Sequence, residues 1–472
     1  MLPDPKKYFI YPSVMPADKK VTMQILPAER AFLLFEGEEY KLRLIDVNGD
    51  ELSYHRPTSH RYLTATAKDG ILTFEWEFEG EGEHLITLYY QDKPLQDFVV
   101  YSLFEDLYAL TPLRGDLHGH SCRSDGVQDP AAVAGHYREM GYDFFALTDH
   151  NRYYPGGEID ETYKGVRLGI TRVKGEEIHG PGSVVHIVHV GGKASVAERY
   201  VHHYEAFEKE IAENYLPRVP ANVPAKYHDR YAKAMWAVDR IHEADGLAIF
   251  PHPYWRTAAK VYNVNDEFTR ILLKSGMFDA IELSGGMSPA GINRFVALWG
   301  EVRAEGVNIP VVGSSDVHTM YDGSSFPNNF TVCFAEKNEN DAIMAAVKAG
   351  LSVAVESTGT EYERHYRCYG SLRLVSYAQY LLEHYFPRLQ RVCQGEGVAM
   401  RAYAMGGTDA ALIEQQVALT AQYSSTFFGR ELPALPSDEV KDYVARWRET
   451  QMNGPETRGS SILLGLSGPR SL

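Results

Sequence analysis

Between about residues 113 and 356, short apolar runs alternate with segments of helical pattern. The apolar runs include DFFALTDH, GLAIFPHP and FDAIELSGG, and two helical segments between such runs are PAAVAGHYREMG and NRFVALWGEVRAEG. This alternation is typical of a largely parallel sheet, either open or closed into a barrel. It constrains the fold strongly, because parallel strands bring their carboxyl ends to one edge, where α/β enzymes place their active sites.

The alternation occupies only the middle of a chain of 472 residues, a length typical of two or three domains. Residues 1–110 show period-two patterns such as GILTFEWEFEG, which predict a β-rich, sandwich-like domain. We place the α/β domain at 111–358. Within this domain, the pattern at about residues 193–245 predicts an insertion of two helices, which serves either as a lid or as a packing element. Residues 359–472 predict a mostly helical region.

Composition narrows the class of partner. The net charge of −16 argues against a nucleic-acid polymer, which needs clustered Lys and Arg, so we expect a small-molecule substrate. The four cysteines form no CxxC pair and indicate reduced thiols in a cytoplasmic protein. No apolar run approaches the length of a membrane span, so we expect no membrane partner. The oligomeric state is not encoded in any of these features.

Potential metal ligands occur in order at the ends of the apolar runs, in the motifs DLHGHS, SDG, LTDHN, GEEI, VVHIVHV, FPHPYW and SSDVH. Imidazole and carboxylate groups are the ligands that hold Zn, Mn or Fe. His118 and His120 are separated by one residue, so in a strand they point the same way. Each residue alone has an ordinary structural interpretation, such as a turn-forming Asp125 or a buried core His150. The ordered set favours a metal centre.

Two motifs leave alternatives open from the residues alone. Glu176 and Glu177 are adjacent, so at most one is expected to face the site. His186 and His189 are three apart in a buried run and therefore face opposite ways. Only one member of each pair can be a ligand.

The motif series DLHGHS, LTDHN, GEE, VVHIV, FPHP and SSDVH resembles the PHP family, named for polymerase and histidinol phosphatase. The resemblance covers about residues 113 to 356 and implies a distorted (β/α)7 barrel, similar to a TIM barrel, with a trinuclear metal centre. It selects Glu177 through the pattern Gly-x-Glu, and it selects His186 over His189. The implied metal ligands are His118, His120, Asp125, His150, Glu177, His186, His252, Asp316 and His318.

Domain order adds a second, looser resemblance. A β-rich domain before DLHGHS is similar to the CehA/McbA branch of these metallohydrolases, which includes carbamate and amide hydrolases. The family resemblance implies two or three divalent ions, and the ligand types accept zinc, manganese and iron alike. Among the implied ligands, we expect Asp125, His252 and Asp316 to act in catalysis as well.

These features predict a metal-dependent hydrolase in which metal-activated hydroxide attacks the substrate. The favoured activity is that of a phosphoesterase on a small phosphorylated metabolite or nucleotide. The alternative is a carbamate, ester or amide hydrolase, and the third interpretation is a non-catalytic metal-binding protein. Candidate substrate contacts are Arg123, Arg152 and Arg256, each of which fits a surface ion pair equally well, and His179, either a general acid or a loop residue. The GxSxG, HExxH and GxxxxGK[ST] signatures are absent.

Overall fold

The computed structural model describes residues 6–49, 60–321, 326–360, 363–442 and 445–446. The chain divides into two compact units, one of residues 3–102 with 426–472 and the other of residues 1–2 with 103–425. Helices and strands are mixed, so the predicted α/β class is confirmed. Residues 447–472 of the predicted helical region lie outside the described residues.

The unit that contains residues 3–102 is built on one eight-stranded sheet with the order β1-β3-β6-β5-β4-β7-β8-β2. Its elements are β1 (Tyr8–Tyr11), β2 (Val14–Pro16), β3 (Lys20–Pro27), η1 (Arg30–Phe32), β4 (Glu39–Asp46), β5 (Arg61–Lys68), β6 (Ile71–Glu77), β7 (Gly82–Tyr90) and β8 (Lys93–Leu103). The predicted alternation is present in β6, where Leu72 and Phe74 are buried and Thr73 and Glu75 are exposed. Residues of β3 and β6 share one core with residues of β4, β7 and β8, so the sheet folds over on itself.

The unit of residues 103–425 contains two further sheets, with the strand orders β11-β10-β9-β17-β18-β19 and β12-β13-β14-β15-β16. Their strands are β9 (Thr111–Asp116), β10 (Phe144–Ala146), β11 (Thr171–Val173), β12 (Gly175–His179), β13 (His186–Val190), β14 (Leu247–Phe250), β15 (Ala280–Ser284), β16 (Val311–Gly313), β17 (Asn329–Ala335), β18 (Ser352–Thr360) and β19 (Glu363–Tyr369). Strands β9, β10 and β11 run parallel, as do β14, β15 and β16. Both sheets are therefore mixed, since β12, β13, β17, β18 and β19 pair antiparallel.

One apolar core joins the two sheets of this unit. Leu113 and Phe144 from the first sheet lie in the same buried cluster as Val188, Ile249 and Val312 from the second. Because both sheets bury side chains in one interior, the ends of their strands meet around a common centre. This arrangement brings residues far apart in sequence to one site.

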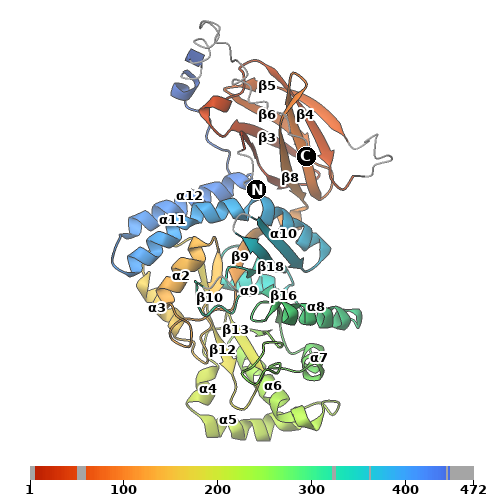
Figure 1. Ribbon diagram of the computed structural model, residues 1–472, viewed down its shortest axis with the longest axis vertical. Helices are drawn as coiled ribbons and strands as arrows, with labels where there is room; N and C mark the ends of the chain where they lie inside the picture. The colour runs from red at the N-terminus through yellow and green to blue at the C-terminus, as the bar shows by residue number, and fades with distance from the viewer. Residues whose placement is uncertain (1–5, 50–59, 322–325, 361–362, 443–444, 447–472) are drawn as a thin grey trace. The chain divides into compact units, whose positions relative to one another are not determined.

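Helices cover the two sheets of this unit (Figure 1). They are α1 (Glu105–Tyr108), α2 (Pro130–Glu139), α3 (Pro155–Thr162), α4 (Ala197–Val201), α5 (Tyr204–Glu210), η2 (Ile211–Tyr215), η3 (Leu216–Arg218), η4 (Ala225–Tyr227), α6 (His228–Glu243), α7 (Asp266–Lys274), α8 (Pro289–Ala304), α9 (Asn340–Lys348), α10 (Leu372–His384), α11 (Phe386–Ala404) and α12 (Ala410–Phe427). Local sequence explains several helix starts, because Asp129 caps α2 and Ser288 caps α8, each just before a proline. Helix α11 packs along α2. No described helix is both long and apolar enough to cross a bilayer.

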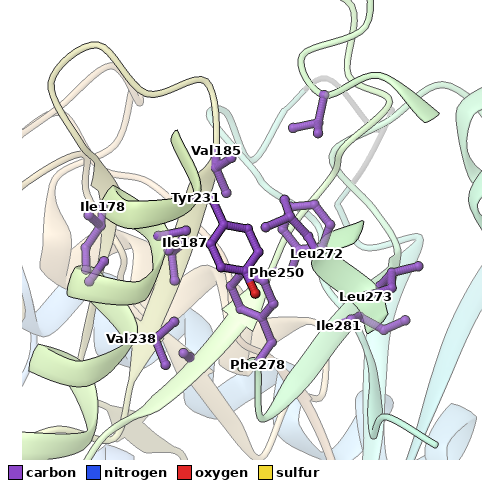
Figure 2. Packing of buried hydrophobic residues seen from close by; sticks show 14 of the residues in the cluster. Ile178, Val185, Ile187, Tyr231, Val238, Phe250, Leu272, Leu273, Phe278 and Ile281 are labelled. Atoms are coloured by element: carbon purple, nitrogen blue, oxygen red, sulfur yellow. The ribbon is translucent and has the colours of Figure 1, made fainter. Parts of the chain in front are cut away.

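The insertion at about 193–245 differs in detail from the two helices predicted there. The first breaks between α4 and α5, because His203 leaves the helical conformation with φ of −136°, and α5 continues into the π-helical turn η2. The insertion is not detached from the core, since Tyr231 and Val238 of α6 lie in one buried cluster with Ile178, Ile187 and Phe250 of the second sheet (Figure 2).

Candidate metal centre

Most of the predicted ligands follow the carboxyl ends of strands, but Glu177 lies within β12 and His186 is the first residue of β13. His118 and His120 come just after β9, His252 follows β14, and Asp316 follows β16. A parallel bridge between Gly119 and Val317 sets the first and last of these segments side by side. A second parallel bridge joins His150 to Glu177. Segments from both sheets thus converge on one place.

Glu177 lies at the centre of this place and is only 1% exposed. The ring nitrogens near its Oε2 atom are Nε2 of His118 at 3.3 Å, Nε2 of His120 at 3.5 Å and Nδ1 of His150 at 2.8 Å. The ring nitrogens near its Oε1 atom are Nε2 of His179 at 3.2 Å, Nδ1 of His186 at 3.0 Å and Nε2 of His252 at 3.2 Å. A carboxylate accepts about four hydrogen bonds, fewer than the imidazoles around this one. Hydrogen bonding to Glu177 therefore does not account for the whole cluster.

Asp316 and Asp125 complete the cluster on two sides. Asp316 Oδ1 lies 3.3 Å from Nε2 of His118 and 3.1 Å from Nε2 of His120. Asp125 is more exposed than Asp316. Its Oδ2 lies 3.3 Å from Nε2 of His150, and its Oδ1 lies 3.3 Å from Nε2 of His318. Three groups have donor atoms within 4.8 Å of one another: His120, Asp125, His150 and His318; His118, Glu177, His252 and Asp316; and His150, Glu177 and His179.

The β12–β13 hairpin shows which residue of each ambiguous pair faces the cluster. Its antiparallel register pairs Glu176 with His189 and His179 with His186. Because side chains alternate along a strand, Glu177 faces the cluster and Glu176 faces away. Nδ1 of His189 lies 3.1 Å from Oε1 of Glu176, and both side chains are fully buried as a pair of their own. His186 is thus the histidine of VVHIVHV that lies in the cluster.

Sequence reasoning missed Glu282 and did not place His179 among the ligands. Glu282 lies within β15, 0% exposed, with Oε2 2.8 Å from Nδ1 of His118. The signal was present in the run AIELS, where a carboxylate interrupts an otherwise apolar buried strand. Asp149, next to His150 in sequence, accepts hydrogen bonds from the backbone and hydroxyl of Ser121 and from the hydroxyl of Ser124.

Two of the clustered residues have unusual backbone conformations. Asp316 has a backbone φ of +53° and His252 has a φ of +24°, values that residues other than glycine rarely adopt. Such conformations each cost on the order of 1–3 kcal/mol and concentrate at functional sites. Gly286 leaves room for this arrangement, because a Cβ atom there would come within 2.8 Å of the His252 side chain.

The electrostatics keep Glu177, Asp316 and His186 in their metal-binding forms. Burial raises the pKa of Glu177, but His118 and the other imidazoles outweigh it and hold the pKa well below its usual range. Burial likewise opposes the charge of Asp316, and His118 and His120 lower its pKa. Burial lowers the pKa of His186 to about 4, so this ring is neutral near neutral pH. Ionised carboxylates and neutral imidazoles are the forms that bind metal ions. Burial lowers the pKa of His118, His150 and His252, but nearby carboxylates outweigh it and raise that pKa, so a metal ion would displace a proton from these rings.

The buried polar atoms also fit a metal centre. Nε2 of His118, Nδ1 of His150, Nδ1 of His186 and Oε2 of Glu177 are buried without a hydrogen-bond partner among the described residues. Buried polar groups are nearly always satisfied, so a concentration of unsatisfied ring nitrogens calls for a ligand. The mixed imidazole and carboxylate donors match zinc, manganese or iron.

The candidate cations have partners outside the cluster. Arg123 forms a bidentate ion pair with Glu158, in which Nη2 lies 2.7 Å from Oε2. Arg152 donates to the backbone oxygen of Arg123. The Arg256 guanidinium is exposed and lies 5.8 Å from the centre of the Tyr262 ring. Nearer the cluster, the exposed ring of Trp255 lies 6.2 Å from that of His186.

No protein-family model matches this chain, and no curated protein matches it. Among solved structures, one similar chain is a two-domain protein from Bacteroides vulgatus that contains a predicted PHP-like metal-dependent phosphoesterase. It has 21% identity and a TM-score of 0.34, over 52% of this chain and 65% of that one. A metal-dependent phosphoesterase candidate from Bifidobacterium adolescentis has 16% identity and a TM-score of 0.32, over 45% of this chain and 89% of that one. An amidohydrolase from Chromobacterium violaceum, with bound sulfate, has 18% identity and a TM-score of 0.30, again over 45% and 89%.

Proposed function

We propose that the chain is a metal-dependent hydrolase of small molecules, with two or three divalent ions held by the cluster around Glu177. The observation that carries this proposal is the convergence of six imidazoles on one buried carboxylate. The motif resemblance to the PHP family agrees with it, and we propose the family's distorted (β/α)7 barrel for residues 111–358. We also propose that the protein is located in the cytoplasm.

When bound, such ions lower the pKa of a water molecule and neutralise negative charge on the substrate. The residues of the chain set the positions of the donor atoms. Glu177 offers one carboxylate oxygen to each side of the cluster, and Asp316 faces both His118 and His120. Asp125 stands at the more exposed side, between His150 and His318, where a substrate has access. We propose that Asp125, Asp316 and His252, whose Nε2 lies 3.2 Å from Oε1 of Glu177, also act in catalysis.

We further propose phosphoester hydrolysis as the reaction. Several adjacent cations suit a phosphoryl group, whose transition state spreads charge over several oxygens. In a chain with a net charge of −16, positive potential for an anionic substrate is best supplied by bound ions. Of the three candidate arginines, Arg123 and Arg152 bond to other groups, and we propose the exposed Arg256, four residues after His252, as the substrate contact.

A second candidate, hydrolysis of a carbamate, ester or amide, is favoured by the rim of the cluster. The exposed Trp255 beside His186 offers an apolar face, whereas Arg123 is already engaged by Glu158. An aromatic rim suits a neutral organic substrate better than a small phosphate.

A substrate panel tests both candidates. Metal-replete protein is assayed with nucleotides, sugar phosphates, an aryl phosphate, aryl carbamates and aryl esters, beside the double variant His118→Ala/His120→Ala. We expect hydrolysis of phosphoesters by the native chain and none by the double variant, which keeps its fold. Activity on carbamates or esters alone would replace the first candidate by the second. Equal metal content and turnover in the double variant would refute the assigned site.

A further inference from the structure

We infer that His179 is a ligand of the metal centre, in addition to the nine that the motif resemblance implies. The inference rests on the proposed function and extends it, since it gives the ions near the β12–β13 hairpin one more imidazole. His179 is the last residue of β12, two positions after Glu177.

Strand geometry places the His179 side chain toward the cluster. Residues two apart in a strand share a face, so His179 and Glu177 point the same way. The antiparallel register sets His179 directly opposite His186 on β13, and opposite residues also share a face. Ile178 and Ile187 lie on the other face, in the apolar cluster with the insertion helix α6 (Figure 2). Three potential donors of one hairpin therefore project to one side.

The distances place His179 as close to the centre as the expected ligands. Its Nε2 atom lies 3.2 Å from Oε1 of Glu177, compared with 3.0 Å for Nδ1 of His186 and 3.2 Å for Nε2 of His252. The rings of His179 and His186 stack with centroids 3.6 Å apart and an interplanar angle of 25°. The nitrogens of these two neighbouring imidazoles thus lie near the same carboxylate oxygen.

His179 also shares a possible ion with a residue of another segment. Its donor atom and those of His150 and Glu177 all lie within 4.8 Å of one another. The His150 and His179 rings have centroids 4.1 Å apart. The Nε2 atom of His179 is buried without a hydrogen-bond partner among the described residues. A general acid would direct its proton toward a substrate, whereas this nitrogen is directed into the cluster.

The backbone of His179 is held in place. Its N–H donates to Oδ1 of Asn151 at 2.7 Å, and the same oxygen accepts from the hydroxyl of Tyr200 on α4. The Asn151 side chain, next in sequence to His150, thus links the His179 backbone to the insertion. A ligand fixed in this way loses little freedom when it binds an ion.

Metal binding without substrate tests the inference. Metal-free native chain, His179→Ala, His179→Gln and the exposed control His202→Ala are titrated with Zn²⁺ and with Co²⁺. Bound metal is measured by elemental analysis and competition with a chromophoric chelator, and the visible absorption of Co²⁺ reports its coordination. Thermal melting of each metal-free variant by circular dichroism identifies any that fails to fold, and His179→Gln keeps the side-chain volume where Ala does not.

We expect both His179 variants to lose one equivalent of metal, or to bind the weakest ion at least about tenfold less tightly, with a changed Co²⁺ spectrum. His202→Ala should match the native chain. Folded His179 variants with native stoichiometry, affinity and spectrum would overturn the inference and leave the proposed function standing. A native chain that binds neither ion would instead overturn the proposed function, and the inference with it.

Discussion

Oε2 of Glu282 lies 2.8 Å from Nδ1 of His118, and neither side chain is accessible to solvent. The contact joins β15 to the segment after β9 and leaves the other ring nitrogen of His118 facing Glu177 and Asp316. A carboxylate in this position orients a ligating imidazole and raises its basicity. We therefore expect Glu282 to support the proposed metal centre through His118 and not as a ligand.

Replacing Glu282 tests that role. We expect Glu282→Gln to weaken binding of the ion at His118 by about 10- to 100-fold, because the neutral amide polarises the ring less than a carboxylate. Chelator competition measures the change, with the exposed Glu336→Gln as the control. Native affinity in a folded Glu282→Gln protein would mean that the contact is only structural.

The position of Glu177 in the cluster predicts how metal ions change the thermal stability of the chain. Ions that bind only the folded chain stabilise it by mass action, about 2.7 kcal/mol when free metal exceeds Kd by 100-fold. Adding Zn²⁺ or Mn²⁺ to metal-free protein should therefore raise Tm. In Glu177→Gln the rise should be smaller, because both sides of the cluster lose their shared carboxylate while the donors His120, Asp125, His150 and His318 remain. Differential scanning calorimetry with and without metal decides the matter, and an undiminished rise in the variant would contradict it.

The contact of α2 with α11 offers a stability test away from the cluster. Arg138 donates through Nε to Oε2 of Glu396 at 2.6 Å, and both are almost fully buried. Glu396→Gln removes the nearer of the two carboxylates that face this guanidinium, leaving Asp143 at 3.4 Å, and should cost about 3 kcal/mol. The same helices carry a more exposed pair, Arg401 with Glu139, and Glu139→Gln should cost less than about 1 kcal/mol. Urea unfolding compares the two variants, and equal losses would refute the ranking by burial.

The pair His242–Asp279 predicts a pH dependence. The hydrogen bond to Asp279, at 2.8 Å, raises the pKa of His242. Burial raises the pKa of Asp279, but His242, the amide of Ala248 and the nearby Lys348 outweigh it and lower that pKa. The histidine's contribution is complete below about pH 6.5 and is lost as pH rises through its raised folded-state pKa. The aspartate's contribution is present above about pH 4 and is lost as pH falls through its lowered pKa.

The stabilising window thus lies between about pH 4 and about pH 6.5. We expect the difference in Tm between native chain and His242→Gln to be largest near the middle of this window and to shrink toward pH 9. Melting curves in chelator remove any contribution from metal, and the exposed His202→Gln serves as reference. A difference that does not change with pH would show that the pair is not ionised in the folded chain.

Much of this organisation was open to prediction from local sequence. The period of two explains β6, where Leu72 and Phe74 are buried, and the βα alternation predicted the α/β class. It did not predict the break before α5, because one histidine in a non-helical conformation leaves no clear mark on a helical pattern. The nature of the site was also visible, since ligand types gather at strand ends.

By itself, the sequence determined which donors are available and that adjacent residues such as Glu176 and Glu177 must point apart. Tertiary structure decided which of them share a centre. The register of β12 with β13 turns Glu177, His179 and His186 to one face, and Glu282 approaches His118 from a strand 164 residues away. The physical reason is that side-chain direction is a local property of a strand. Proximity, in contrast, depends on how separate strands pair and pack around one core.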